Sequence, residues 1–221
     1  MERWATFDCY GTLVDWNAGI GSGLARLLPD ADAAALLARY HELEPQVEAE
    51  AYRPYAEVLA VTAQRVAAEH GLDLPDESAR ELSRSLPDWP VFPEARDALA
   101  EARARGWRLA ILSNTDRSLL DGSMRAIGVP FDHSIVAEEV RSYKPAHRHW
   151  ERFAADTGAA PDRHVHVAQS LFHDIAAANE LGLRSVWINR LGETSGDGAL
   201  PTRELPDLVA LPDTLDQLVR P

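Results

Sequence analysis

The sequence contains little that could hold the chain together covalently or anchor it in a membrane. Its 221 residues include one cysteine, Cys9, which excludes an intrachain disulfide and favours a reducing compartment. No apolar run is long enough for a signal peptide or a membrane span. We therefore expect a cytoplasmic protein that does not bind membranes.

Positive charge is also scarce. The chain has 22 Lys and Arg residues against 35 Asp and Glu residues, which gives a net charge of -13. A surface with this balance repels nucleic acid on average, so nucleic acid is not an expected partner. A local basic pocket could still hold a small anion. The hydrophobic fraction of 46% and the charged fraction of 26% are ordinary for a globular protein with a sizeable core.

Short apolar runs alternate with helix-like segments over most of the chain. The expected strands cover residues 4–7, 108–112, 134–137, 164–168 and 185–189. The expected helices between the later strands cover residues 94–105, 117–127, 147–157 and 175–181, each ending near a glycine. This alternation predicts an α/β protein with a parallel sheet that helices cover on both faces.

One long segment breaks the alternation. Residues 15–90 have a helical period, are divided by Pro45 and Pro54, and contain no convincing strand. We therefore predict a doubly wound, Rossmann-like sheet as the core domain, residues 1–14 and 91–221, with an inserted all-helical cap domain, residues 15–90. Near the end of the chain, residues 192–207 are rich in turn-forming residues and predict a mobile surface loop.

Polar groups follow four of the predicted strands. In an open parallel sheet, ligands bind beyond the carboxyl ends of the strands, so these groups should converge on one crevice. They are Asp8 after the first strand, Ser113 and Asn114 after the second, Lys144 after the third, and Gln169, Ser170, His173 and Asp174 after the fourth.

Four motifs in order along the chain resemble those of the haloacid dehalogenase superfamily of hydrolases. They are "FDCYGTLVD", "ILSNTD", "SYKP" and "SLFHDIAAANELG". The resemblance implies that Asp8 is a nucleophile and that the helical insert covers the active site. The chemistry of the residues agrees, because a carboxylate can attack carbon or phosphorus and form an ester or acyl phosphate that water cleaves. Lys144 would keep Asp8 ionised and offset Asp174.

Two positions favour attack on carbon over attack on phosphorus. Phosphatases of this superfamily usually carry a second aspartate two residues after the nucleophile, where this chain has Tyr10, a poor acid at neutral pH. Gln169 stands where they commonly have an acid of the magnesium site, which leaves only Asp8 and Asp174 as charged ligands for Mg²⁺. Halide leaves as an anion and needs neither a proton donor nor a metal.

The chain resembles the 2-haloacid dehalogenase (type II) branch most closely. The segment "RYHELE" is similar to a signature of that branch whose arginine binds the substrate carboxylate, which implies this role for Arg39. Trp150 stands near a tyrosine of that branch and is expected at the substrate. His173 and Gln169 depart from the branch's pattern around Asp174, so they either replace its water-handling groups or indicate another substrate.

Three other residues have simpler interpretations. His164 and His166 lie on one side of a strand, but no Cys or carboxylate in the sequence completes a metal site with them, so we interpret them as structural. Cys9 lacks the surroundings of a thiol nucleophile and is expected to be a small buried side chain.

These observations lead to the hypothesis of hydrolytic dehalogenation of small 2-haloalkanoic acids to 2-hydroxy acids, without a cofactor. Asp8 forms the ester, Asp174, Lys144 and His173 assist its hydrolysis, and the substrate contacts are Tyr10, Arg39, Ser113, Asn114, Gln169 and Trp150. The expected partners are a small anionic substrate and halide, and a homodimer is left open. The alternatives are a Mg²⁺-dependent phosphatase, another displacement at the alpha carbon of a carboxylate (such as opening of a strained cyclic amino acid), and a non-catalytic ligand-binding relic.

Overall fold

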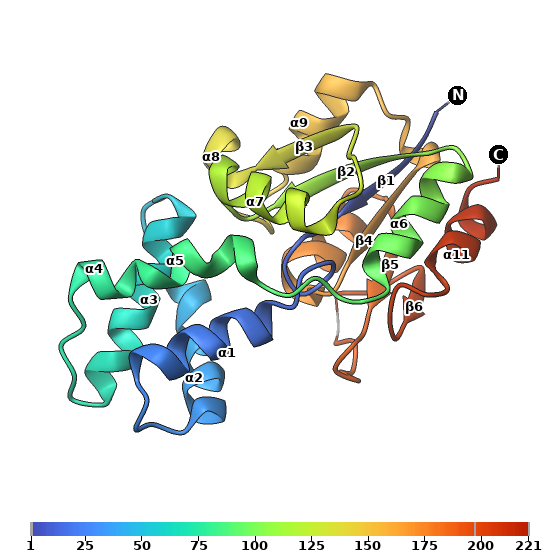
Figure 1. Ribbon diagram of the computed structural model, residues 1–221. Helices are drawn as coiled ribbons and strands as arrows, with labels where there is room; N and C mark the ends of the chain where they lie inside the picture. The colour runs from blue at the N-terminus through green and yellow to red at the C-terminus, as the bar shows by residue number, and fades with distance from the viewer. Residues whose placement is uncertain (1, 197, 221) are drawn as a thin grey trace.

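A six-stranded parallel sheet forms the centre of the computed structural model, which describes residues 2–196 and 198–220 (Figure 1). The strands are β1 (Arg3–Phe7), β2 (Trp107–Ser113), β3 (His133–Val136), β4 (His164–Ala168), β5 (Arg184–Ile188) and β6 (Arg203–Leu205). Their order is β3-β2-β1-β4-β5-β6, and every neighbouring pair is parallel. The chain therefore winds outward in both directions from β1, and the switch point lies between β1 and β4. The predicted doubly wound sheet is confirmed.

Helices cover both faces of the sheet, because successive residues of a strand point to opposite sides. Trp4 of β1 packs in one hydrophobic cluster with side chains of α9 and α10, whereas Ala5 and Phe7 pack in another with α6, α7 and α11. The helical elements of the core are α6 (Ala95–Ala104), α7 (Arg117–Ile127), α8 (Ala137–Val140), α9 (Arg148–Thr157), η2 (Pro161–Arg163), the π-helical turn η3 (Leu171–Ile175), α10 (Ala176–Glu180) and α11 (Leu211–Leu218).

The inserted segment is helical in all its elements, as predicted. It consists of α1 (Trp16–Leu27), α2 (Ala33–Glu48), α3 (Tyr55–Glu69), α4 (Asp76–Ala79), α5 (Glu81–Ser85) and η1 (Leu86–Asp88), which we call the cap helices. They gather at one side of the molecule in Figure 1. Gly23 of α1 allows a close approach to α5, because a Cβ atom there would lie 2.2 Å from Cδ1 of Leu82.

The two connections between the cap helices and the sheet run side by side. The Asp15 amide donates to the Pro90 carbonyl at 2.7 Å, and the Phe92 amide donates to the Leu13 carbonyl at 3.0 Å. Val14 and Val91 form an antiparallel bridge between these hydrogen bonds. We propose that this paired connector is the boundary between a core of residues 1–14 and 91–221 and a cap of residues 15–90.

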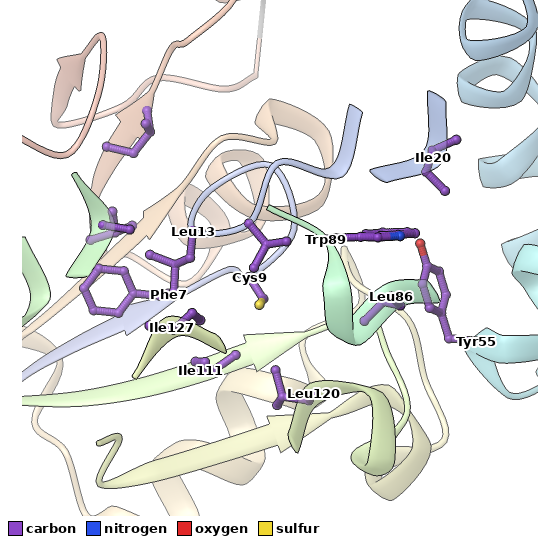
Figure 2. Close-up of a cluster of buried hydrophobic side chains, with 14 of the residues drawn as sticks. Phe7, Cys9, Leu13, Ile20, Tyr55, Leu86, Trp89, Ile111, Leu120 and Ile127 are labelled. Atoms are coloured by element: carbon purple, nitrogen blue, oxygen red, sulfur yellow. The ribbon is translucent and has the colours of Figure 1, made fainter. Parts of the chain in front are cut away.

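Packing and hydrogen bonds also join the cap helices to the core. One buried cluster runs from Phe7 of β1 and Cys9, on one face of the sheet, to Ile20 and Trp89 on the cap side (Figure 2). The Asp116 carboxylate, which follows β2, accepts the first amides of α3, from Tyr55 at 2.8 Å and Ala56 at 2.9 Å. A helix begins with unpaired amides, so a core residue satisfies the start of a cap helix. Cys9 is fully buried in this cluster, as expected of a structural cysteine.

One expectation about the end of the chain is wrong. The segment 192–207, predicted as a loop throughout, contains the edge strand β6, in which Leu205 pairs with Ile188 of β5. Three residues are too few for a periodic pattern, so the strand is defined by its neighbour and not by its own sequence. Residue 197 of this segment lies outside the described residues.

Candidate active site

The polar groups at the four strand ends do converge, as predicted from the parallel sheet. They line one cavity of about 570 Å³ between the core and the cap helices. Asp8, Ser113, Lys144 and Asp174 contribute from the core, and helices α1, α2 and α3 contribute from the cap. The cavity also lies beside the switch point between β1 and β4, where ligands bind in doubly wound sheets.

Lys144 lies between the two acids. Its Nζ donates to Asp174 Oδ1 at 2.6 Å, to Asp8 Oδ1 at 2.9 Å and to the Leu112 carbonyl at 2.9 Å. All three donor positions of the ammonium group are therefore used. Lys144 is the only lysine of the chain, and it is buried. Burial alone would lower the pKa of Lys144, but the two carboxylates raise that pKa above its usual value.

Asn114 holds the lysine's backbone in place. The Asn114 side chain accepts the Lys144 amide at 2.7 Å through Oδ1, and its Nδ2 donates to the Lys144 carbonyl at 3.1 Å. The neighbouring Ser113 is fully buried and lines the cavity, and its Oγ has no hydrogen-bond partner among the described residues. Asn114 therefore positions Lys144, while the Ser113 hydroxyl is left without a partner among the described residues.

Asp8 is held at both carboxylate oxygens. Lys144 binds Oδ1, and Thr12 Oγ1 donates to Oδ2 at 3.1 Å while accepting the Gln169 amide at 2.9 Å. Burial raises the pKa of Asp8 above its usual value, Lys144 opposes this, and Asp174 adds to it. Asp174 differs, because Lys144 and His166 outweigh its burial and lower its pKa. One lysine is thus shared unequally by two carboxylates.

Asp174 begins a buried chain of hydrogen bonds that the sequence interpretation missed. His166 Nε2 lies 2.9 Å from Asp174 Oδ1, His166 Nδ1 lies 2.9 Å from Thr6 Oγ1, and Thr6 Oγ1 lies 2.7 Å from His164 Nε2. Burial lowers the pKa of His164 to about 3, so this ring is neutral. The histidines, interpreted above as structural, therefore connect to Asp174, the acid predicted to assist catalysis. Their alternation on the strand before that acid was the available signal.

We predict that His166→Phe slows hydrolysis of the ester on Asp8, the step that Asp174 is expected to assist, by roughly tenfold. The reason is that the Asp174 carboxylate loses one of its hydrogen bonds. His166→Gln keeps an N–H donor near the Nε2 position and should recover most of the rate. Single-turnover kinetics separates this step from the preceding one. Equal rates for the Phe and Gln variants would contradict a positioning role.

His173 links the core to the cap helices. It lies on η3, where Ser170 Oγ accepts the His173 amide at 3.0 Å and lies 3.1 Å from the ring Nδ1. Its Nε2 lies 3.6 Å from Glu48 Oε2 of α2. Burial works to lower the pKa of His173, but Glu48 raises that pKa above its usual value. The π-helical turn that places His173 in the cavity was not expected from the sequence.

Tyr10 and Gln169 line the cavity as predicted. The Tyr10 hydroxyl forms a hydrogen bond with Ser123 Oγ at 3.1 Å, and burial raises the pKa of Tyr10 well above its usual value. Tyr10 is therefore no proton donor at neutral pH. The Gln169 side chain donates to Glu193 at 3.2 Å.

Two predicted substrate contacts lie elsewhere. The Arg39 guanidinium is on the cap surface and binds Glu69 at 2.6 Å and Glu42 at 2.6 Å. Trp150 is buried, and its ring packs edge-on against His166 of β4 with the ring centroids 5.2 Å apart. Neither residue lines the cavity, so both expectations are corrected. His41, and not Arg39, lies on the cavity side of α2. The two residues face nearly opposite sides because two positions along a helix correspond to a rotation of about 200°.

The cap side of the cavity contains acids and aromatic rings that the sequence interpretation did not select. The residues of α2 that line it are His41, Glu44, Pro45 and Glu48, spaced as one helix face, and Trp16 and Tyr55 lie beside them. The Tyr55 hydroxyl donates to Glu44 Oε1 at 2.6 Å. Burial raises the pKa of Glu44 to about 8, so this side chain is largely protonated at neutral pH.

The donor set does not fit Mg²⁺. Lys144 Nζ already bridges Asp8 Oδ1 and Asp174 Oδ1. The position where related phosphatases commonly have a further acid of the magnesium site is the neutral Gln169. A hard cation prefers several charged oxygens. Within residues 2–196 and 198–220, no group of three or more His, Cys, Asp or Glu side chains could hold a metal ion.

In the same residues, no helix is both long and apolar enough to cross a membrane.

Comparisons with known proteins agree with this geometry. The model of the haloacid dehalogenase-like hydrolases matches residues 3–182. The chain is 30% identical to (S)-2-haloacid dehalogenase H-109 of Pseudomonas putida, over 95% of this chain and 96% of that protein. It is 33% identical to a phosphoserine phosphatase of Thermus thermophilus, but over 60% of this chain and 55% of that protein. The structure of L-2-haloacid dehalogenase from Xanthobacter autotrophicus with chloropropionic acid covalently bound shares the fold, with a TM-score of 0.86, 19% identity, and coverage of 97% of this chain and 98% of that one.

Proposed function

The chain belongs to the haloacid dehalogenase-like hydrolase family, and we propose that it hydrolyses small 2-haloalkanoic acids to 2-hydroxy acids. The observation that carries the proposal is the bridge of Lys144 between Asp8 and Asp174, next to Tyr10. The bridge supplies positive charge beside the nucleophile without a cofactor. Relatives that match over nearly their whole length include two (S)-2-haloacid dehalogenases, covered to 96% and 98%.

In the first step, a carboxylate oxygen of Asp8 attacks the alpha carbon of the substrate. The new carbon–oxygen bond forms as the carbon–halogen bond breaks, and the bonding pair leaves with the halide. No proton is transferred. Because burial removes water from Asp8, its carboxylate is a stronger nucleophile than one in solution. Lys144 and Thr12 hold the carboxylate in one orientation.

In the second step, water adds to the ester carbonyl of Asp8 and releases the 2-hydroxy acid. The unpartnered Oδ2 of Asp174, which lines the cavity, orients the water. His173, whose pKa Glu48 raises above its usual value, accepts a proton from this water as general base and returns it to the oxygen that leaves with the 2-hydroxy acid. The other carboxylate oxygen of Asp174, Oδ1, stays bound to Lys144 and His166.

The substrate carboxylate needs a partner other than Arg39. Ser113 is our candidate, since its buried Oγ has no partner among the described residues and lies at the strand end beside Lys144's support, Asn114. A hydroxyl can donate to a carboxylate, and the Lys144 ammonium group lies in the same cavity. We also propose that the enzyme acts in the cytoplasm, where its one thiol stays reduced.

The decisive experiment measures halide release from both enantiomers of 2-chloropropionate and from chloroacetate, with and without a chelator. We expect halide release that the chelator does not reduce. An aryl phosphate is assayed in parallel, because one partial relative is a phosphatase. Phosphate release that vanishes on chelation, together with no halide release, would replace this proposal with a Mg²⁺-dependent phosphatase.

A further inference from the structure

Two nitrogen-bearing rings lie face to face on the cap side of the cavity. Trp16, the first residue of α1, and His41 of α2 stack with ring centroids 4.6 Å apart and planes 9° from parallel. Both residues line the cavity that contains Asp8. Stacking fixes the orientation of each ring, so their N–H groups are held without further contacts.

Both rings carry a buried nitrogen without a partner. Trp16 Nε1 and His41 Nε2 are shielded from solvent, yet neither makes a hydrogen bond to any residue in 2–196 or 198–220. Buried polar groups without partners are rare and costly, and they often mark a place that a ligand completes. An indole nitrogen can only donate. Burial lowers the pKa of His41, so its neutral ring carries one N–H that can be at Nε2.

The direction of the reaction places the leaving group near these rings. Asp8 directly follows β1 on the core side of the cavity, and the cap helices form the opposite wall. In a displacement, the nucleophile and the leaving group are on opposite sides of the attacked carbon. A halide expelled by Asp8 therefore moves away from the sheet and toward the cap helices.

Among the described residues, no Lys or Arg of the cap helices lines the cavity to receive that halide. Arg39 lies outside the cavity, and Arg190 lines it from the core, where it binds Glu94 at 2.7 Å and its Nε has no partner among the described residues. The acids on this wall already have partners: Asp15 accepts the Ala18 amide at 2.9 Å, and Glu44 accepts the Tyr55 hydroxyl. Glu48 faces His173. Among the described residues of the cap helices that line this wall, Trp16 and His41 carry buried nitrogens without a hydrogen-bond partner, so they are the donor pair that an anion would complete.

We propose that Trp16 Nε1–H and His41 Nε2–H form the halide subsite, so that two neutral donors do the work that a guanidinium would otherwise do. This inference rests on the proposed function. In the transition state the two N–H groups stabilise the negative charge that develops on the halogen, and afterwards they bind the halide product. No atom is transferred by this pair, and the halide leaves unchanged.

The test measures halide binding without turnover, by chloride-35 NMR line broadening, in the wild type and four variants. Trp16→Phe and His41→Phe keep the stacked rings but remove the N–H groups, and each should weaken chloride binding by roughly tenfold or more. His41→Gln keeps a donor and should bind nearly as the wild type does. Trp107→Phe removes an indole N–H at the opposite end of the sheet, where it donates to Asp216, and serves as the matched control.

Turnover supplies a second readout. Smaller halides accept stronger hydrogen bonds, so Trp16→Phe should lose more activity with 2-chloropropionate than with 2-iodopropionate. Equal chloride affinity in the wild type and both folded Phe variants would overturn the subsite, as would equal losses for all halogens. If the wild type releases no halide from any substrate but its chloride binding depends on Trp16 and His41, the proposed function fails and the anion subsite stands. If both Phe variants dehalogenate at the wild-type rate, the halide subsite fails and the proposed function stands.

Discussion

Halide release by the Asp8→Asn variant is expected to fall by roughly 10⁴-fold or more, because the reaction loses its nucleophile and not merely a supporting contact. The change is nearly isosteric, and Lys144 keeps its hydrogen bonds to Asp174 and to the Leu112 carbonyl. The variant should therefore fold normally. Halide release by the variant is compared with that of the wild type, and circular dichroism checks that the variant is folded. The mass of the variant is measured to exclude deamidation back to aspartate.

The companion variant Asp174→Asn separates the two steps of the reaction. Asp8 can still expel halide, but the water loses its orienting carboxylate, so the ester should accumulate on Asp8. Mass spectrometry of the protein quenched with 2-chloropropionate would detect the added 1-carboxyethyl group, the ester formed at the alpha carbon, and locate it on the peptide containing Asp8. Absence of any adduct, in this variant and in the wild type, would support a ligand-binding relic instead of an enzyme.

The shifted pKa of Asp8 adds a pH dependence. Since burial raises that pKa, the nucleophile becomes protonated at a higher pH than an exposed aspartate would. An ordinary aspartate loses its charge near pH 4. As the pH is lowered, the turnover rate should therefore begin to fall at a pH above this value. The rate of halide release in single turnover, followed from pH 4 to pH 8, checks this directly. A rate that stays constant down to pH 4 would contradict it.

Lys144→Met is expected to be the most damaging substitution for stability, and it should also abolish activity. It leaves the Asp8 and Asp174 carboxylates buried beside each other without a cation, which costs about 3–5 kcal/mol of unfolding free energy. Urea unfolding at pH 7 measures the loss. No other lysine can substitute, since the chain has one.

The loss should depend on pH in a definite direction. In the wild type, Asp174 has a lowered pKa and contributes stability that is present above its unfolded pKa and lost as the pH falls. Without Lys144, the pKa of the paired carboxylates rises, so protonation at lower pH relieves their repulsion. The stability difference between wild type and variant should therefore shrink from pH 7 toward pH 4.

The double variant Asp8→Asn with Lys144→Met provides the control. It removes one of the two charges and should recover part of the stability lost in Lys144→Met, because the repulsion between carboxylates disappears. A loss in Lys144→Met that is the same at every pH, and that the second substitution does not reduce, would show that packing and not charge explains the effect.

The main features of this protein follow from its sequence alone. The alternation of strands and helices determined the doubly wound sheet, because each apolar run must be buried on both faces. The same alternation put Asp8, Lys144 and Asp174 at one edge, since parallel strands all end on the same side. Their contacts, from 2.6 to 2.9 Å, required no long-range information beyond that topology.

Other features were decided only by the tertiary structure. Motif resemblance selected Arg39, but the rotation of α2 against the core turned His41 toward the cavity and left Arg39 paired with Glu69. The rotation of a helix depends on all its packing contacts, so a short motif cannot determine it. His166 lies in a strand whose pattern indicates only burial, and its contact with Asp174 exists because the π-helical turn brings that acid back over β4. Strand ends are determined locally, whereas helix orientation and buried hydrogen bonds depend on the whole fold.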